Sequence, residues 1–206
     1  RVIIAWNSPH DEAALASVAR QVATCGAERI WLVLDRVHAQ ADVNLDAARY
    51  ALAREAYETD GRWIGGYEAL SYLPERAMEP AEGAARWANG LALRQVALSE
   101  QRVQAGSALL VDLGFEAENP LAEDLTLYVH LVPPAGPVLA GRDGPPAYGG
   151  APSSRWEPGE THLERRAVPI PADAAPGPYT LIVGWLTPEG TRVPLEGLAE
   201  SEAALV

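Results

Sequence analysis

The chain has 206 residues, 48% of them hydrophobic and 21% charged, with a formal net charge of −12 at pH 7. This length and apolar content allow one large or two small folded domains and exclude a disordered chain. The acidic balance, with no basic cluster, disfavours a nucleic-acid partner, and no window approaches the roughly 20 consecutive apolar residues of a membrane helix.

Residues 1–76 alternate strand and helix patterns. An apolar run at 2–6 predicts a buried strand. Ser8, Pro9 and Asp11 then have the chemistry of a helix start, and Gly26 ends the predicted helix just after Cys25. Because the first residue is Arg1 and a strand pattern begins at once, we expect the sequence to be a fragment of a longer protein.

A second strand is predicted at 30–34 and a second helix from Asn44 to about Thr59. Residues 62–73 indicate a third strand, in which Gly65 and Gly66 mark a bulge or bend. The order β-α-β-α-β predicts a small, mostly parallel, three-stranded α/β unit over 1–76, which we expect to be truncated.

Residues 77–89 are rich in Pro, Glu, Gly and Ala and indicate a linker. Beyond it, apolar and polar residues alternate with a period of two, as in half-buried strands. The predicted strands lie at 91–98, 109–116, 125–131, 138–140, 162–170, 179–185 and 192–195. Seven short strands separated by Pro- and Gly-rich turns predict an antiparallel, immunoglobulin-like β-sandwich over 90–198, followed by a tail at 199–206. The fold class is therefore α+β.

The sequence gives little evidence for a catalytic or metal-binding site in the α/β part. Ser8, His10 and Asp11 are neighbours in sequence, where triad geometry is rare, and a helix cap accounts for Ser8 and Asp11. The turn after the first strand lacks the glycines of a dinucleotide site. We therefore expect no cofactor and no catalytic residue here.

The loop after the second strand carries Asp35, His38 and Asp42, at the end of the sheet where α/β sites lie. A solvated loop is the favoured interpretation over a metal site. Cys25 is the single cysteine, which excludes an internal disulfide, and a buried structural thiol is expected.

A long loop over 141–160, rich in turn residues, is the candidate ligand-binding region. Tyr148 and Trp156 are aromatic platforms of the kind that stack on sugar rings, and Asp143 lies in the same loop. Packing of Trp156 across the sandwich is the structural alternative. His130 and His162 lie in predicted strands without metal-ligand spacing, so surface or packing roles are expected.

Several stretches resemble known modules. Residues 143–146 (DGPP), 149–150 (GG), 156–160 (WEPGE) and 171–184 (beginning PADAAPGPYTL) resemble sandwich modules at the ends of large bacterial membrane proteins. Residues 29–34 (RIWLVL) and 62–73 (RWIGGYEALSYL) are similar to the soluble tail of membrane glycosyltransferases. The family that this similarity suggests is the dolichyl-phosphate-mannose-protein mannosyltransferase-like group, whose members use a lipid-phosphate-linked sugar as donor.

The resemblance implies a non-catalytic, extracytoplasmic C-terminal region of a bacterial membrane glycosyltransferase, acting as scaffold or acceptor-recognition module. Its implied partners are a carbohydrate or lipid-linked sugar acceptor, and the membrane through the rest of the parent protein. The family's catalytic acidic residues lie in its membrane half, which nothing in this sequence matches. Three alternatives stay open: a carbohydrate-binding sandwich of another cell-surface protein, a purely structural or assembly module, and a free-standing enzyme, in which Asp11, Asp35 or His38 would converge in a pocket.

Overall fold

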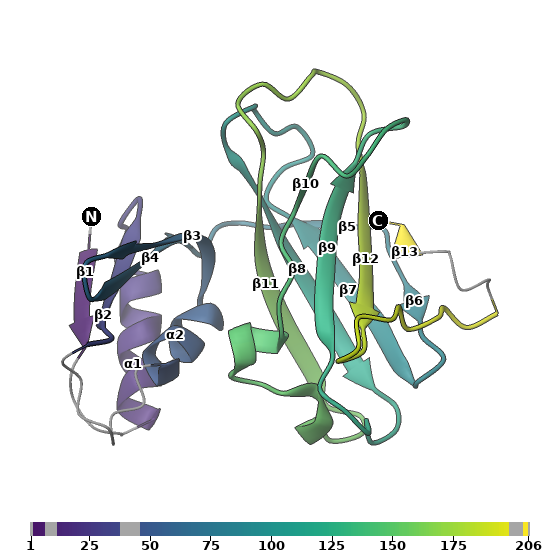
Figure 1. Ribbon diagram of the computed structural model, residues 1–206, viewed down its shortest axis with the longest axis horizontal. Helices are drawn as coiled ribbons and strands as arrows, with labels where there is room; N and C mark the ends of the chain where they lie inside the picture. Colours follow the sequence, from purple (N-terminus) through teal and green to yellow (C-terminus); the bar gives the residue numbers. More distant parts are fainter. Residues whose placement is uncertain (1, 7–11, 38–45, 198–203, 206) are drawn as a thin grey trace. The chain divides into compact units, whose positions relative to one another are not determined.

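The computed structural model describes residues 2–6, 12–37, 46–197 and 204–205. The chain has few helices and mostly antiparallel sheets (Figure 1). It divides into two compact units, unit 1 at Arg1–Arg76 and unit 2 at Ala77–Val206. Within the described residues, no helix is long and apolar enough to cross a membrane.

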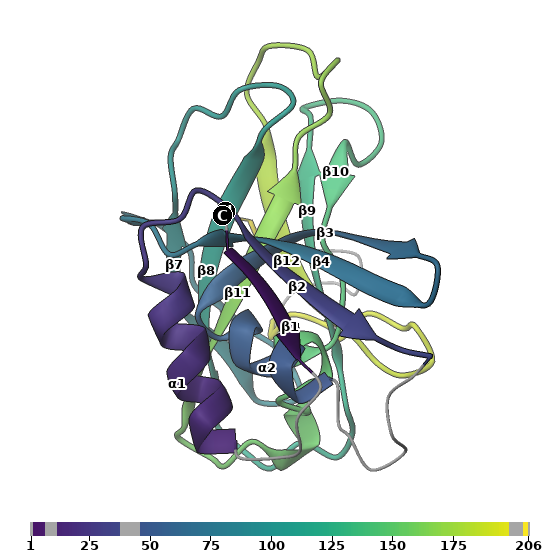
Figure 2. The ribbon, with the colours of Figure 1, turned by 90° about the vertical axis from the view of Figure 1, so that its left-hand side faces the viewer.

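Unit 1 is a four-stranded sheet with two helices on one face (Figures 1 and 2). Its elements are β1 (Val2–Trp6), α1 (Glu12–Ala23), β2 (Ile30–Asp35), α2 (Asp46–Ala53), β3 (Ala56–Ile64) and β4 (Tyr67–Pro74). The inner helix residues Leu15 and Leu52 share one hydrophobic cluster with Ile30, Leu32 and Leu70 of the sheet. The spacing of the apolar helix residues thus decides which side of each helix is buried.

The sheet of unit 1 differs from the three-stranded, mostly parallel prediction. Its order is β1-β2-β4-β3, and only β1 and β2 are parallel. Gly65 and Gly66 form a two-residue turn between β3 and β4, with Gly65 at φ +62°, rather than a bulge inside one strand. Strands joined by such a short turn are necessarily antiparallel.

The second helix also ends earlier than predicted. It was expected to reach Thr59, but α2 ends at Ala53 and β3 begins at Ala56. Residues 56–58 pair with β4 instead, and this buries Tyr57 and Glu58, which are 0% and 4% exposed. Strand pairing and burial outweigh the local helix preference of this segment. The predicted helix-start residues Ser8, Pro9, Asp11 and Asn44 lie outside the described residues.

Unit 2 consists of two sheets packed face to face (Figure 1). Its strands are β5 (Glu79–Ala81), β6 (Ala85–Arg86), β7 (Leu91–Leu98), β8 (Ala108–Ala117), β9 (Thr126–Val132), β10 (Ala140–Gly141), β11 (Thr161–Pro169), β12 (Thr180–Leu186) and β13 (Ala204–Leu205). One sheet has the order β11-β8-β7-β5, with β6 also paired to β7, and the other has the order β10-β9-β12-β13.

The core of unit 2 lies between the sheets and contains the alternate residues that the sequence pattern indicates. Leu109, Val111, Leu113 and Phe115 of β8 meet Leu127, Val129, Leu131, Leu181, Val183 and Trp185 of the facing sheet. Phe115 contacts Trp185 edge to face, with ring centroids 4.8 Å apart. Successive strand residues point to opposite faces, so the polar alternates face outward.

Three segments of unit 2 differ from expectation. The linker expected over 77–89 contains β5 and β6, which pair with β7 and satisfy its backbone groups on that side. Pro80 is tolerated because β5 is an edge strand. The strand expected over 192–195 contains isolated bridges at Arg192 and Leu195, since Pro194 lacks the amide that a ladder needs. In the expected tail, residues 204–205 pair with β12 as β13.

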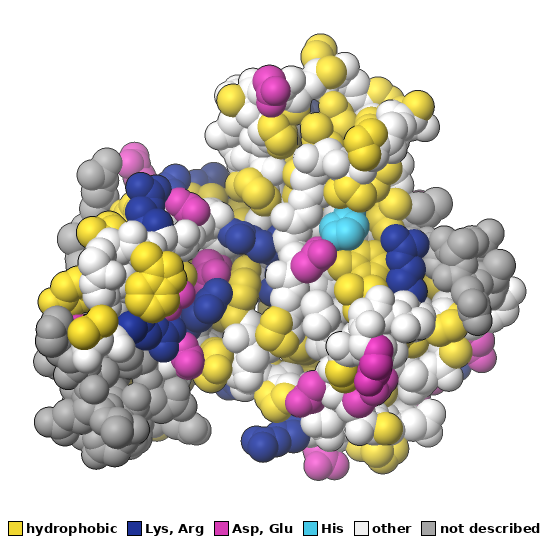
Figure 3. Space-filling model, in the orientation of Figure 1, with side chains coloured by type: hydrophobic (Ala, Val, Ile, Leu, Met, Phe, Trp, Pro, Cys, Tyr) yellow, Lys and Arg dark blue, Asp and Glu magenta, His cyan; other side chains and the backbone are white. Residues whose placement is uncertain are grey.

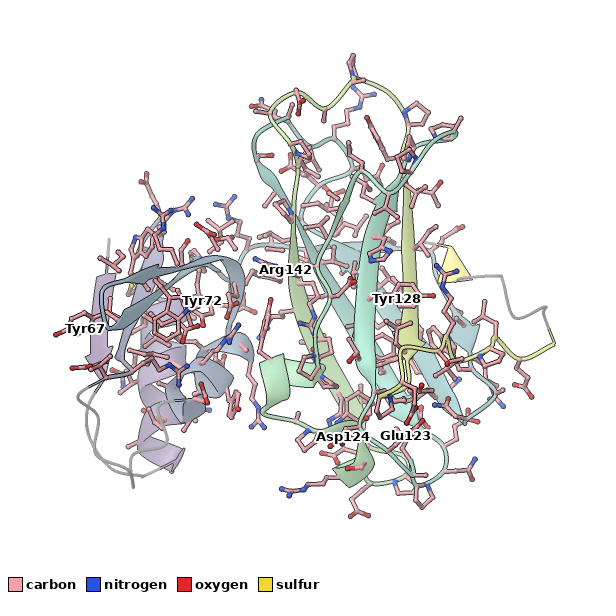
Figure 4. The ribbon with its side chains drawn as sticks, in the orientation of Figure 1. Tyr67, Tyr72, Glu123, Asp124, Tyr128 and Arg142 are labelled. Atoms are coloured by element: carbon pink, nitrogen blue, oxygen red, sulfur yellow. The ribbon has the colours of Figure 1, made fainter. Side chains whose placement is uncertain are left out.

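The long loop between β10 and β11 contains two short 3-10 turns, η1 (Pro146–Gly149) and η2 (Ser153–Arg155). The buried Ser153 hydroxyl accepts from the Leu125 amide at 2.8 Å and donates to the Glu123 carbonyl at 3.1 Å. The adjacent Asp124, labelled in Figure 4, accepts from the Ser154 amide, and hydrogen bonds from Ser154 lower the pKa of this carboxyl. These bonds fasten the loop to the segment before β9.

Candidate functional site

The outward face of the sheet β10-β9-β12 carries a group of polar and aromatic side chains. Leu127, Val129 and Leu131 of β9 point into the core. By alternation, Tyr128 and His130 point outward. The long loop continues the pairing of β10, because Gly144 and Leu127 exchange both backbone hydrogen bonds at 3.0 Å. Asp143, one residue earlier, therefore faces outward beside β9.

His130 and Asp143 form a direct contact on this face. The Nε2 atom of His130 lies 2.9 Å and 3.0 Å from the two carboxylate oxygens of Asp143. Their side chains are 23% and 46% exposed, so solvent reaches both. Gly141 makes room for the imidazole, because a Cβ at this position would lie 2.6 Å from Cδ2 of His130. The glycine thus leaves free the space that the ring occupies.

Tyr128 lies beside His130, with ring centroids 5.1 Å apart at 38°, and across Gly184 of β12, its cross-strand partner. A Cβ at Gly184 would lie 2.1 Å from the Tyr128 hydroxyl, so only glycine admits the ring here. The guanidinium of Arg192 covers the ring at 5.5 Å from its centroid. Tyr128 is only 4% exposed, whereas Arg192 is exposed.

We call Tyr128, His130, Asp143 and Arg192 the outer-face cluster. Figure 4 shows Tyr128 over β9 and β12, and Figure 3 shows a histidine with acidic and basic side chains nearby on that face. Burial raises the pKa of the Tyr128 phenol; the Arg192 cation opposes this rise and the Asp143 carboxylate adds to it. The phenol therefore lies within the electrostatic influence of two opposite charges.

The cluster offers a carboxylate acceptor, an imidazole and a guanidinium donor on an open strand face. This combination suits hydrogen bonding to a polyhydroxylated ligand. His130 and Asp143 supply two metal-ligand side chains, and no group of three or more such residues occurs in the described part of the chain.

The predicted ligand-binding residues lie in different surroundings. Asp143 belongs to the outer-face cluster. Tyr148 lies against the buried Arg166, whose Cζ is 4.7 Å from the ring centroid. Trp156 is 4% exposed and stacks on His162, with centroids 4.0 Å apart at 7°. Its Nε1 donates to the Ala151 carbonyl at 3.0 Å. Trp156 thus lies in the core of the sandwich, as the structural alternative expected. A ligand-binding role for Tyr148 and Trp156 stays a prediction.

In unit 1, the Asp35 carboxylate accepts the amide of Val37 at 3.1 Å and so caps the turn after β2. The other residues of unit 1 that were considered for catalysis or metal binding lie outside the described residues; they are Ser8, His10, Asp11, His38 and Asp42. The expected burial of Cys25 is wrong: the thiol is exposed, because α1 ends at Ala23 and the chain leaves the hydrophobic face before reaching it.

Sequence reasoning missed the roles of Tyr128, His130 and Arg192, although one signal for them was present. Gly184 interrupts the strand predicted at 179–185, and Gly141 directly follows the one predicted at 138–140; a strand glycine often marks the close approach of another group. The side chains that fill those spaces depend on strand pairing, which the sequence pattern does not specify.

Comparison with known proteins identifies no family. No protein-family profile and no curated protein matches the chain. Among solved structures, a similar one is an endonuclease/exonuclease/phosphatase from Beutenbergia cavernae DSM 12333, with 10% sequence identity and a TM-score of 0.33. The alignment covers 94% of this chain and 62% of that one, so the chain spans less than two thirds of its length. A likeness at this TM-score carries no argument about fold or function.

Proposed function

We propose that the chain is the non-catalytic, extracytoplasmic C-terminal region of a membrane glycosyltransferase of the dolichyl-phosphate-mannose-protein mannosyltransferase-like family. In this proposal its sandwich recognises a carbohydrate or lipid-linked sugar acceptor. The resemblance of residues 143–146 and 156–160 to terminal sandwich modules supports the family, and the outer-face cluster supports recognition. The carrying observation is the contact of His130 with both carboxylate oxygens of Asp143 on an exposed strand face.

The residues of the cluster have separate roles in this proposal. The Asp143 carboxylate accepts hydrogen bonds from sugar hydroxyls, and His130 holds it in place. Arg192 donates hydrogen bonds from its guanidinium. Tyr128 is too buried to stack on a sugar ring, so its aromatic face positions Arg192 by a cation-π contact instead. An open strand face contacts only one side of a ligand, so we expect weak binding.

The immunoglobulin-like classification is part of the same proposal. Two antiparallel sheets packed over one core support it at the level of architecture. The strand order supports it as well: β8 lies between β7 and β11 in one sheet, and β9 pairs with β12 in the other, as the strands A, B and E and the strands C and F of the immunoglobulin type do.

The second candidate function is a carbohydrate-binding sandwich of another cell-surface protein, which the same cluster supports. The two candidates differ in what the coding sequence upstream of Arg1 encodes. A glycosyltransferase parent predicts many apolar spans there, and another surface protein predicts a different architecture. Sequencing the gene on the 5′ side of this segment distinguishes them.

The binding test is a glycan array combined with thermal-shift titration of the purified chain. We expect a saturable response that Asp143→Ala and Arg192→Ala each abolish. Asp173→Ala and Arg102→Ala are matched controls, because both residues are exposed and lie outside the cluster. Trp156 is unsuitable for such a test, since truncating a core residue destabilises the fold. A flat response of the parent chain would exclude recognition and leave the scaffold role.

A further inference from the structure

Four large hydrophobic side chains are exposed at the turn end of the β3–β4 hairpin in unit 1. Val37, Trp63, Ile64 and Tyr67 have exposed fractions of 65%, 64%, 59% and 44%. We call these four residues the hairpin tip. The other large exposed hydrophobics in the described part of the chain are Val138 and Leu163 of unit 2, at 47% and 41%. Contiguous exposed apolar groups of this kind mark interaction sites.

The backbone holds the hairpin tip together. Ile64 and Tyr67 are direct cross-strand partners on either side of the two-residue turn. Gly66 contacts Val37 so closely that a Cβ on this glycine would lie 2.6 Å from Cγ2 of Val37. The Arg36 amide donates to the Gly66 carbonyl at 3.0 Å, which ties the turn after β2 to the hairpin. In Figure 4, Tyr67 lies at the edge of unit 1, whereas Tyr72 lies inside it.

The hairpin tip is apolar on both faces of the hairpin. Consecutive strand residues point to opposite faces, so Trp63 and Ile64 diverge, yet both are more than half exposed. A protein partner that docks on one face of a hairpin leaves the other side chain in water. An apolar medium that surrounds the turn removes both from water. This arrangement favours a lipid environment over a protein surface.

The size of the hairpin tip also fits a lipid environment. A buried aromatic side chain covers about 150–250 Å², so four partly exposed side chains supply roughly 500 Å² at most. With an equal area on a partner, such a contact would bury about 1,000 Å² in total, which is the lower limit for a stable protein interface and requires good shape complementarity. Lipids rearrange around a small convex group without such a requirement, and Trp and Tyr prefer the interface between water and hydrocarbon.

The charges around the hairpin tip indicate the type of bilayer. Arg62 pairs with Asp60 at 3.0 Å, and Arg36 pairs with both Glu68 and Asp46 at 2.6 Å, so these ion pairs at the base of the hairpin leave no excess positive charge. The whole chain carries −12, which repels an anionic surface. We propose that the hairpin tip inserts into the headgroup region of a zwitterionic phospholipid bilayer.

Vesicle flotation of the whole chain with phosphatidylcholine tests this proposal. We expect the parent chain to float with the vesicles and the double variant Trp63→Ser/Ile64→Ser to partition about tenfold less, because partitioning scales with the buried apolar area. The matched control Val138→Ser/Leu163→Ser should partition within about twofold of the parent. Brominated lipids should quench part of the tryptophan fluorescence of the parent and of the control, and less of it in Trp63→Ser.

Thermal melts check folding, and the tip variants should melt with the parent because the replaced side chains contribute little to the core. Vesicles with an equal share of anionic phosphatidylglycerol should bind less chain at low salt. Absence of vesicle binding by the parent, equal binding by the tip variant, or stronger binding to the anionic vesicles would each overturn the proposal. A dimer of the parent chain in sedimentation experiments without lipid, if the tip variant is monomeric, would also overturn it. The hairpin tip would then bind a second copy of the chain.

Discussion

Glu164 and Arg166 form an ion pair inside the β-sandwich, where their side chains are 3% and 0% exposed and Oε2 lies 2.9 Å from Nη2. Both point inward, because β11 pairs them with the core residues Leu113 and Val111 of β8. The same Arg166 nitrogen donates to the Pro145 carbonyl at 2.9 Å. The ion pair therefore fastens the long loop over the edge of the sandwich.

The loop segment that this pair holds has an unusual backbone. Ala147 and Tyr148 adopt φ values of +46° and +55°, in the left-handed region that side-chain-bearing residues rarely occupy. The Glu164 carboxylate accepts the Ala147 amide at 3.0 Å and 3.1 Å, and the Tyr148 ring covers Arg166. Contacts with the ion pair thus offset the local strain of the turn.

Glu164→Ala should reduce the free energy of unfolding by about 3–5 kcal/mol, because it leaves the buried Arg166 charge without its counterion. Urea denaturation measures the loss. Glu116→Ala, which breaks the exposed ion pair with Arg94, is the matched control and should cost about 1 kcal/mol or less. The double variant Glu164→Leu/Arg166→Met should be more stable than Glu164→Ala. A loss for Glu164→Ala no larger than that of the control would refute this account.

Gly184→Ala should displace the Tyr128 ring, since the new Cβ would overlap the phenol oxygen. We expect a loss of about 1–3 kcal/mol from overpacking, together with a change in near-UV circular dichroism. In the Tyr128→Ala background, Gly184→Ala should cost little, so the double variant should lose less stability than the sum of the two single losses. Strictly additive losses would show that the ring does not depend on Gly184.

The Tyr128 phenol should titrate later than an ordinary tyrosine, because burial raises its pKa. The pKa of Tyr128 is higher in the folded chain than in the unfolded chain. The protonated phenol therefore contributes fully to the stability of the fold below the usual tyrosine pKa of about 10. This contribution is lost as the pH rises through the folded pKa. Alkaline absorbance titration, as the difference between the parent and Tyr128→Phe, measures the shift.

The charges of Arg192 and Asp143 provide a control for that titration, because they shift the pKa of Tyr128 in opposite directions. Arg192→Ala should raise the pKa of Tyr128 further, because the cation lowers it in the parent chain, and Asp143→Asn should lower it. Opposite signs in the two variants are the expected result. Shifts in the same direction, or none, would mean that the charges of the outer-face cluster do not reach the phenol.

Much of unit 2 was predictable because its information is local. The alternation of Leu109, Val111, Leu113 and Phe115 indicates both the strand and the face that it buries, and all four lie in one core. Unit 1 was less predictable. The segment from 56 to 59 continues a helical pattern, yet it forms the start of β3, where Glu58 receives two hydrogen bonds from Arg49. Contacts with residues distant in the sequence therefore decided that this segment forms a strand.

The sequence by itself determined which faces of the β8, β9 and β12 strands point inward, because these follow from the spacing of the apolar residues. Only the tertiary structure decided which side chains meet on the outward face. His130 contacts Asp143, and Tyr128 lies over Gly184 with Arg192 above it, because β9 pairs with β10 and β12 in one register. Register is a long-range property: a shift by one residue would exchange the inward and outward side chains and remove the cluster.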